Sequence, residues 1–321
     1  MSKPAIIAIG HYDDISRDRM TDRFEVTWVD APADLGDLPD ATRAAALSLA
    51  FHSHDPMGGD LMDLVPNVGL IANFGVGYDA IDVDAAEARN IVVTNTPDVL
   101  NDDVADLGVG LYLALRRGVI EGDRWVRSGD WAREGTMPLK TKASGRRVGI
   151  LGMGRVGREL ADRLAAFKCE VHYQSRRPKD TPPDWVFHAD ATSLAAACDA
   201  LFVTVVGGPE TEGMVSAEVI EALGAEGVLI NMARGSVIDE EALIDALQAG
   251  TIAGAALDVF LREPDPDQRF LGLDNVILQP HQGSATQETR AAMALLQFRN
   301  LACYADGAPL PTCVTKVCTP A

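Results

Sequence analysis

Short apolar runs alternate with amphipathic segments along most of this 321-residue chain. Within each run the residues are apolar at successive positions, which is typical of parallel strands covered by helices on both faces. In the first part of the chain the predicted strands are residues 5–9, 25–29, 45–50, 68–72 and 91–94. In the second part they are residues 147–151, 170–174, 200–206, 227–232, 252–259 and 275–279. This alternation predicts an α/β protein.

The alternation breaks at residues 96–101, where Pro97 stands, and we interpret this break as a hinge between two domains. A long apolar-rich helix is predicted after it, over residues 102–126, with Asn101 as its N-cap. Later helices are predicted at residues 155–167, 239–249 and 286–304. The tail, residues 307–321, has no periodicity, and we expect it to return to the first domain.

One segment, residues 145–177, has the pattern of a nucleotide-binding βαβ unit. Gly152, Gly154 and Gly157 follow an apolar strand and open a helix. In this motif the first glycine permits the tight turn, the second lets backbone approach a pyrophosphate, and the third lets the helix pack closely on the strand. The N-terminus of the helix then offers N–H groups and a positive dipole end to phosphate.

The end of the second strand of this unit indicates which dinucleotide is bound. An NAD site usually has Asp or Glu there, to accept a hydrogen bond from the ribose 2′-hydroxyl. This chain has Ser175, Arg176 and Arg177 instead. Two guanidinium groups and a hydroxyl suit a 2′-phosphate, so the sequence favours NADP. The alternative is that both arginines are solvated loop charges.

The composition indicates which classes of partner the protein does not bind. The formal charge is −19 and the isoelectric point about 4.6, so we expect neither nucleic acid nor a membrane surface as a partner. The five cysteines form no Cys-x-x-Cys pair and are odd in number, which is typical of free thiols in a reducing cytoplasm. No metal site, signal peptide or membrane span is predicted, because the first apolar run is short and no run reaches about 18 residues.

Polar residues follow three strands of the second half, where ligands bind in open α/β sheets. They include Arg234, Glu263 and His281. A guanidinium can bind a carboxylate and polarise a carbonyl, and a protonated imidazole can supply a proton as hydride arrives from a nicotinamide. A neighbouring carboxylate orients the imidazole and favours its charged form. Taken alone, each has an ordinary structural interpretation, as a salt-bridge former, a loop acid or a surface histidine.

The ordered motifs together resemble the D-isomer-specific 2-hydroxyacid dehydrogenase family, over about residues 45–312. Besides the segments above, the resemblance rests on residues 74–82 and 95–106. It is strongest to the NADP-dependent glyoxylate and hydroxypyruvate reductases and to the hydroxyphenylpyruvate reductases. The resemblance implies two Rossmann-like, doubly wound parallel-sheet domains with a hinge cleft between them. Residues 1–98, completed by 287–321, would bind the substrate, and residues 99–286 would bind NADP.

The resemblance also implies the site residues. Arg234, Glu263 and His281 take the catalytic roles. The substrate residues are Phe51, His52, Val76, Gly77 and Arg234. The cofactor residues are Val104, Gly152, Met153, Gly154, Arg155, Val156, Ser175, Arg176, Arg177, Val206, Gly207, Thr211, Met232, Ala233, Asp258, His281 and Gly283. A homodimer through the cofactor domains is implied, with Trp131 in the segment that reaches across it.

One feature of the sequence bears on the substrate but does not decide it. Phe51 and His52 stand in the pocket loop, where bulky rings would narrow the cavity and favour glyoxylate or hydroxypyruvate over phenylpyruvate. Larger aryl 2-oxo acids, such as hydroxyphenylpyruvate, are the alternative within the class. A third interpretation is a dinucleotide-sensing binding protein similar to the related corepressors.

Val206, Gly207 and Gly208 depart from the family pattern, so the wall of the cofactor site beside the adenine is expected to be looser.

Overall fold

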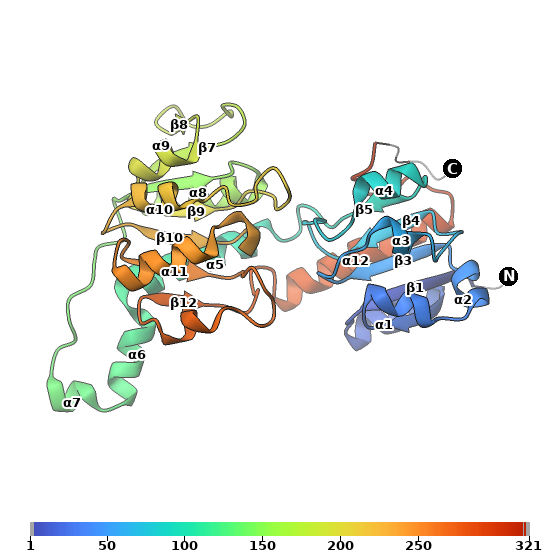
Figure 1. Ribbon diagram of the computed structural model, residues 1–321, viewed down its shortest axis with the longest axis horizontal. Helices are drawn as coiled ribbons and strands as arrows, with labels where there is room; N and C mark the ends of the chain where they lie inside the picture. Colours follow the sequence, from blue (N-terminus) through green and yellow to red (C-terminus); the bar gives the residue numbers. More distant parts are fainter. Residues whose placement is uncertain (1–2, 317, 319–321) are drawn as a thin grey trace. The chain divides into compact units, whose positions relative to one another are not determined.

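The computed structural model describes residues 3–316 and residue 318, so residues 317 and 319–321 of the predicted tail lie outside the described part. The chain forms two compact units. Unit 1 runs from the N-terminus to Val99 and resumes at Thr286, and unit 2 runs from Leu100 to Ala285. Both are drawn in Figure 1. In the described part no helix is both long and apolar enough to span a membrane.

Unit 1 contains a five-stranded sheet in the order β2-β1-β3-β4-β5, with every pair of neighbours parallel. Its strands are β1 (Ala5–Gly10), β2 (Glu25–Val29), β3 (Ser48–His52), β4 (Leu70–Asn73) and β5 (Val92–Thr94). Its helices are α1 (Asp14–Arg23), α2 (Asp40–Ala45), α3 (Gly59–Met62), α4 (Val83–Ala88) and α12 (Gln287–Ala305), with a 3₁₀ turn at Pro32–Asp37. Two separate apolar clusters include side chains from β1, β3, β4 and β5 that alternate along each strand, which explains why the strands are apolar throughout.

Unit 2 contains a seven-stranded parallel sheet in the order β12-β11-β10-β9-β6-β7-β8. Its strands are β6 (Arg147–Leu151), β7 (Glu170–Gln174), β8 (Val186–His188), β9 (Ala200–Val203), β10 (Val228–Asn231), β11 (Gly254–Leu257) and β12 (Val276–Leu278). The strand order reverses direction between β6 and β9, which is the switch point where doubly wound sheets bind dinucleotides. The predicted pair of doubly wound sheets is confirmed.

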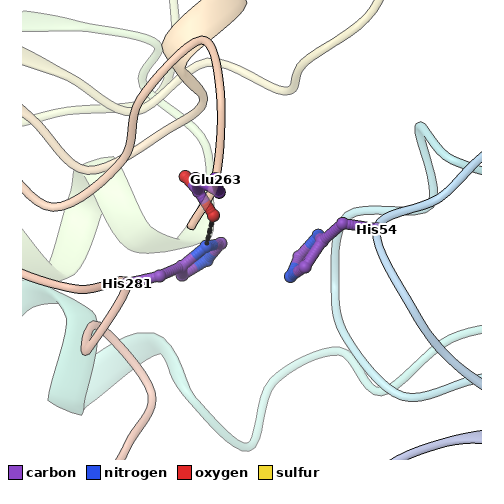
Figure 2. Close-up of side chains that lie close together, drawn as sticks. All are labelled: His54, Glu263 and His281. Carbon is purple, nitrogen blue, oxygen red and sulfur yellow. Dashed lines mark hydrogen bonds and ion pairs between the residues drawn. The ribbon is translucent and has the colours of Figure 1, made fainter. Parts of the chain in front are cut away.

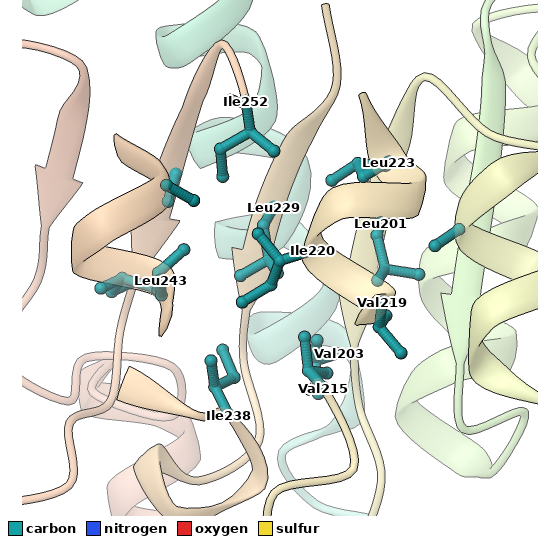
Figure 3. Packing of buried hydrophobic residues seen from close by; sticks show 14 of the residues in the cluster. Leu201, Val203, Val215, Val219, Ile220, Leu223, Leu229, Ile238, Leu243 and Ile252 are labelled. Carbon is teal, nitrogen blue, oxygen red and sulfur yellow. The ribbon is translucent and has the colours of Figure 1, made fainter. Parts of the chain in front are cut away.

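The helices of unit 2 are α5 (Asn101–Arg117), α6 (Val119–Arg127), α7 (Asp130–Glu134), α8 (Arg155–Ala166), α9 (Ala191–Ala196), α10 (Ala217–Leu223) and α11 (Glu240–Ala249). Short 3₁₀ turns lie at Gly235–Val237 and Gln268–Gly272. Helices α10 and α11 pack on the sheet: in Figure 3, Ile220 of α10 lies beside Leu229, and Leu243 of α11 belongs to the same apolar cluster. Asp239 caps α11 by accepting from the Ala242 N–H, and Gly250 ends the helix with φ 69°.

The single helix predicted over residues 102–126 is wrong. Gly118 adopts a left-handed conformation with φ 59° and divides the segment into α5 and α6. Asn101 is the first helical residue rather than a side-chain cap, and Leu100 precedes it. In Figure 1, α6 and α7 extend away from the sheet of unit 2. The prediction also missed β8, whose three residues pair with β7 at the edge of the sheet.

The tail returns to unit 1 as predicted. The Val314 N–H donates to the Val93 carbonyl at 2.8 Å, and the Thr312 hydroxyl donates to the Asn95 carbonyl at 2.7 Å. The expectation of five free thiols is wrong for two of them, because Cys313 and Cys318 form a disulfide. The tail turns back on itself there and brings the two sulfur atoms together. Cys169, Cys198 and Cys303 are free.

Candidate active site

The glycine-rich loop joins β6 to α8 at the switch point of the unit 2 sheet. Gly152 has φ 106°, and a Cβ there would lie 2.7 Å from the Val205 nitrogen. A Cβ at Gly157 would lie 2.2 Å from the Gly152 carbonyl oxygen, so α8 packs on the loop at a distance that only glycine allows. A Cβ at Gly154 would meet no atom within 4 Å. The loop is tight on the protein side and open at Gly154, as an approaching pyrophosphate requires.

The N-terminus of α8 differs from those of the other long helices. Among the described helices of eight residues or more, it is the one without an acidic residue in its first turn. Gly154 precedes it without a side-chain cap, and Arg155 begins it. A cation at a helix N-terminus opposes the helix dipole unless an anion binds there. This arrangement fits a dinucleotide, with Met153, Gly154, Arg155 and Val156 around its phosphates.

The residues after β7 are polar; Ser175 is half-buried, and Arg176 and Arg177 are exposed. The Ser175 hydroxyl donates to the Arg177 carbonyl at 2.6 Å, which closes a short turn. Neither Arg176 nor Arg177 has an ion-pair partner within the part of the chain that the structure describes. Both guanidinium groups are therefore available to an anionic ligand at this strand end.

The loop after β9 stands beside the glycine-rich loop. The Thr204 hydroxyl donates to the Gly152 carbonyl at 2.9 Å and links the two. Further along, the Thr211 hydroxyl donates to the Val206 carbonyl at 2.6 Å, so the segment containing Gly207 forms a closed turn. The Val206 side chain is 63% exposed, as a residue lining an open ligand site would be.

A buried amide shapes the loop that carries Arg234. The Asn231 side chain, at the end of β10, accepts from the Ala233 N–H at 3.0 Å and donates to the Arg234 carbonyl at 3.0 Å. A Cβ at Gly235 would lie 1.9 Å from the Phe260 carbonyl carbon, so this loop lies directly against the segment after β11. The Arg234 side chain is half-buried and donates to the Ala233 carbonyl at 2.8 Å.

Glu263 and His281 are hydrogen-bonded to one another at the same edge of the sheet. Figure 2 shows the Glu263 Oε2 and His281 Nδ1 atoms facing one another, 2.8 Å apart, and also draws His54 of unit 1. The other Glu263 oxygen accepts from the Phe260 N–H at 3.0 Å, so the carboxylate is anchored on both sides. Because a carboxylate oxygen accepts, Nδ1 is the donor in this pair. Nε2 is then the nitrogen that can exchange a proton with a ligand.

Asp258 holds the His281 loop in place. Its carbonyl accepts from the His281 N–H at 2.9 Å, and its two carboxylate oxygens accept from the Gln282 N–H at 2.6 Å and the Gly283 N–H at 2.8 Å. His281 itself has a left-handed φ of 54°. Burial raises the pKa of the Asp258 carboxyl, and the two N–H donors oppose that rise. The resemblance assigns Asp258 to the cofactor, whereas its contacts in this chain fix the backbone around His281.

The remaining residues expected near the nicotinamide lie together. A Cβ at Gly283 would meet the Asp258 carboxylate at 3.0 Å, Val104 at 3.4 Å and Met232 at 3.8 Å. These four residues come from α5 and from the segments directly after β10, β11 and β12. Ala233 is buried directly after Met232. The tertiary fold thus gathers them at the carboxyl edge of the sheet.

In unit 1, the loop after β4 has its carbonyls fixed and its N–H groups open. The Asn73 amide donates to the Gly77 carbonyl at 2.8 Å and to the Gly75 carbonyl at 3.1 Å, and the Asn95 amide donates to the Val76 carbonyl at 2.9 Å. The N–H groups of Val76 and Gly77 donate no hydrogen bond within the described residues. Adjacent open N–H groups form a concave site for an anion.

The pocket role expected of Phe51 is not met. Its side chain is fully buried in the core of unit 1, because the alternation along β3 directs it into an apolar cluster. His52, the next residue, points to the other face of the sheet and is half-buried. Its Nδ1 lies 2.6 Å from the His11 carbonyl oxygen. Burial, together with the charge of Arg290, lowers the pKa of His52 to about 4.

Three asparagines that shape the site escaped the sequence reasoning. Asn73, Asn95 and Asn231 each stand at or just after the end of a parallel strand, and each fixes the loop that follows. An Asn at that place was the available signal, since its amide can bond backbone on both sides of a turn. It was overlooked because asparagine is common in any loop.

Residues 109–283 match the model of the NAD-binding domain of the D-isomer specific 2-hydroxyacid dehydrogenases. Hydroxyphenylpyruvate reductase of Plectranthus scutellarioides is 46% identical over 253 residues, which cover 79% of this chain and 80% of that protein. Glyoxylate/hydroxypyruvate reductase A of Arabidopsis thaliana is 46% identical over 254 residues, 78% of this chain and 80% of that protein.

A solved structure resembles the whole chain. The NADPH-dependent glyoxylate/hydroxypyruvate reductase of Sinorhizobium meliloti, determined with NADP and malonate, has a TM-score of 0.94 and 40% identity. The match covers 100% of this chain and 99% of that one. The chain therefore belongs to the D-isomer specific 2-hydroxyacid dehydrogenase family, and it is a nicotinamide-dependent oxidoreductase of that class.

The role of Asp258 can be tested with Asp258→Asn. An amide has one acceptor oxygen where the carboxylate has two, so either the Gln282 or the Gly283 N–H loses its partner and faces an NH₂ group. We expect the free energy of unfolding, measured in urea, to be about 1–3 kcal/mol lower than that of the parent protein. We also expect turnover to fall. Asp274→Asn, at an exposed loop acid of the same unit, is the matched control and should change neither quantity. Equal behaviour of the two variants would contradict the positioning role.

Proposed function

We propose that this protein is an NADPH-dependent reductase of small 2-oxo acids, glyoxylate or hydroxypyruvate, which it converts to the 2-hydroxy acids. The observation that carries the proposal is the Glu263–His281 pair at the edge of the sheet that also holds the glycine-rich loop. The activities for which the Arabidopsis and Sinorhizobium relatives are named support it.

Each polar residue has a role in this reaction. The N–H groups of Val76 and Gly77 and the guanidinium of Arg234 bind the substrate carboxylate, and Arg234 also polarises the 2-oxo group. His281 donates a proton from Nε2 to the developing alkoxide. Glu263 holds Nδ1 and stabilises the imidazolium by its charge. NADPH, when bound, supplies the hydride.

We propose that unit 2 binds the cofactor and that unit 1 binds the substrate. The support in unit 2 is the glycine-rich loop, the acid-free N-terminus of α8 and the arginines after β7. Val206, Gly207 and Thr211 would line the adenosine side. The support in unit 1 is the loop after β4 with its open N–H groups.

We further propose a homodimer through unit 2, in the cytoplasm. The segment of α6, α7 and the residues that follow, 119–139, exposes apolar side chains that a second copy would cover, among them Val126, Trp131 and Leu139. Leu139 is 95% exposed and Trp131 is 63% exposed, which is unusual for large apolar side chains in a protein without a partner.

A larger aryl 2-oxo acid is the second candidate substrate, favoured by the Plectranthus relative. Steady-state kinetics with NADPH and a panel of 2-oxo acids decides between them. We expect glyoxylate and hydroxypyruvate to exceed phenylpyruvate in kcat/KM, because the ring of His52 and its neighbour Phe74 fill space beside the β4 loop. A clear preference for phenylpyruvate would establish the second candidate. Absence of turnover with every acid would favour a dinucleotide-sensing binding protein.

The proton donor is tested with His281→Ala. We expect turnover to fall by about 10²- to 10⁴-fold, as is typical of the loss of a general acid, while NADPH affinity stays nearly intact. Glu263→Gln keeps a hydrogen-bonding group but removes the charge that stabilises imidazolium, so its deficit should grow as the pH rises. Gln282→Ala, at an exposed neighbour of His281, serves as the control. If the Glu263→Gln enzyme has the pH profile of the parent, Glu263 is only a structural acid of its loop.

The cofactor preference is tested with the double variant Arg176→Ala and Arg177→Ala. A charge-assisted hydrogen bond contributes about 1.5–3 kcal/mol, so NADPH should bind roughly ten- to a few hundred-fold more weakly while NADH changes little. The binding of NADPH should also become less sensitive to salt. Lys179→Ala, another exposed cation of the same loop, is the matched control. If the parent protein prefers NADH, or if both cofactors weaken equally, the NADP assignment fails.

A further inference from the structure

Three side chains of unit 1 gather beside the β4 loop and are not used by the reaction as described so far. The ring of His52, at the end of β3, lies 4.3 Å from the ring of Phe74, centre to centre. The Arg290 guanidinium, from the first turns of α12, lies 5.8 Å from the centre of the same Phe74 ring. Phe74 directly precedes the loop that contains Val76 and Gly77. The surface formed by His52, Phe74 and Arg290 therefore adjoins the place proposed for the substrate carboxylate.

The hydrogen-bonding state of His52 follows from its neighbours. A carbonyl oxygen can only accept, so the 2.6 Å contact with His11 requires that Nδ1 carries the hydrogen. The pKa of His52 is lowered to about 4, chiefly by burial and further by the charges of Arg290, His54 and His11. At neutral pH the ring is uncharged, and its Nε2 atom is a hydrogen-bond acceptor.

Arg290 is a hydrogen-bond donor, whereas Nε2 of His52 is an acceptor. A guanidinium can only donate hydrogen bonds, and it stays charged at every physiological pH. The surface thus combines an acceptor, Nε2 of His52, with a cationic donor, and Phe74 lies between them as an apolar support.

One common chemical group complements both. A hydroxyl can donate to Nε2 and accept from the guanidinium at the same time. A carboxylate would satisfy Arg290 but would place a second acceptor against Nε2. A methyl or phenyl group would remove water from both polar groups and offer neither a partner, which is costly.

We propose that His52 and Arg290 form a subsite for a hydroxyl group on carbon 3 or beyond of the 2-oxo acid. This inference rests on the proposed function and refines it: the preferred substrates are hydroxylated 2-oxo acids, and His52 selects by hydrogen bonding as well as by filling space. Hydroxypyruvate is the smallest acid that fills the subsite, and glyoxylate leaves it empty.

Hydroxypyruvate and pyruvate differ by this one hydroxyl, so the ratio of their kcat/KM values measures the subsite. We expect the parent enzyme to favour hydroxypyruvate by about ten- to several hundred-fold, because a site that bonds a hydroxyl rejects the analogue without it. His52→Phe keeps a ring on Phe74 but removes the acceptor, and Arg290→Met keeps length but removes the donor. Each variant should lower the ratio about tenfold or more, mainly through the KM for hydroxypyruvate.

Two further variants separate this effect from a loss of structure. Arg17→Met removes another half-buried guanidinium of unit 1, which stacks 3.9 Å from the centre of the Trp28 ring, and should leave the ratio at the parent value. His52→Gln retains an acceptor and should restore part of the ratio lost in His52→Phe. Variants that misfold would lose both substrates together, whereas loss of the subsite changes the ratio.

The outcomes distinguish the inference from the proposed function. If glyoxylate is reduced but the parent ratio is near one, or if neither His52→Phe nor Arg290→Met lowers it, the subsite is overturned and the reductase assignment stands. If no 2-oxo acid is reduced with NADPH, the proposed function fails and the subsite fails with it.

Discussion

In a parallel sheet every strand ends at the same edge, and this geometric constraint places the chemistry of the molecule. In unit 2 the glycine-rich loop, the Arg234 loop, the Glu263 loop and the His281 loop each follow a different strand. They converge because their strands are parallel neighbours, although more than a hundred residues separate Gly152 from His281. The switch in strand order between β6 and β9 leaves room there for a dinucleotide.

Buried polar side chains convert these strand ends into fixed loops. Asn73, Asn231 and Asp258 are nearly inaccessible to solvent. Asn73 and Asn231 are each hydrogen-bonded to backbone of the loop that follows them, and Asp258 is hydrogen-bonded to backbone of the loop after β12. An unpaired polar group in such a place would destabilise the fold, so the pairing also selects the loop conformation. The carbonyls of the β4 loop are occupied by amides in this way, and the N–H groups are left facing outward. Residues that touch no ligand thus decide where ligand-binding atoms lie.

The groups of unit 2 that suit an anion are local exceptions in an acidic protein. The chain carries a formal charge of −19, which opposes anionic ligands at long range. The N-terminus of α8 lacks the acid that the other long helices of the described residues have in their first turn. Arg176 and Arg177, at a neighbouring strand end, have no ion-pair partner among the same residues. At short range these groups outweigh the general field, because solvent and salt screen the distant carboxylates more strongly than direct contacts.

The sequence by itself determined the two parallel sheets and the nucleotide loop, and it predicted Arg234, Glu263 and His281 as polar residues that follow strands. These features depend on local signals: apolar runs, glycine spacing and polar residues after strands. It could not determine that Gly118 divides a helix, that Cys313 pairs with Cys318, or that Phe51 lies in the core while His52 faces Phe74. Adjacent residues of a strand point to opposite faces, so which of the two reaches a site depends on strand register and packing. The contacts of Asp258 and Arg290 were likewise decided by the tertiary structure, because their partners are distant in the chain and only the packed fold brings them within bonding distance.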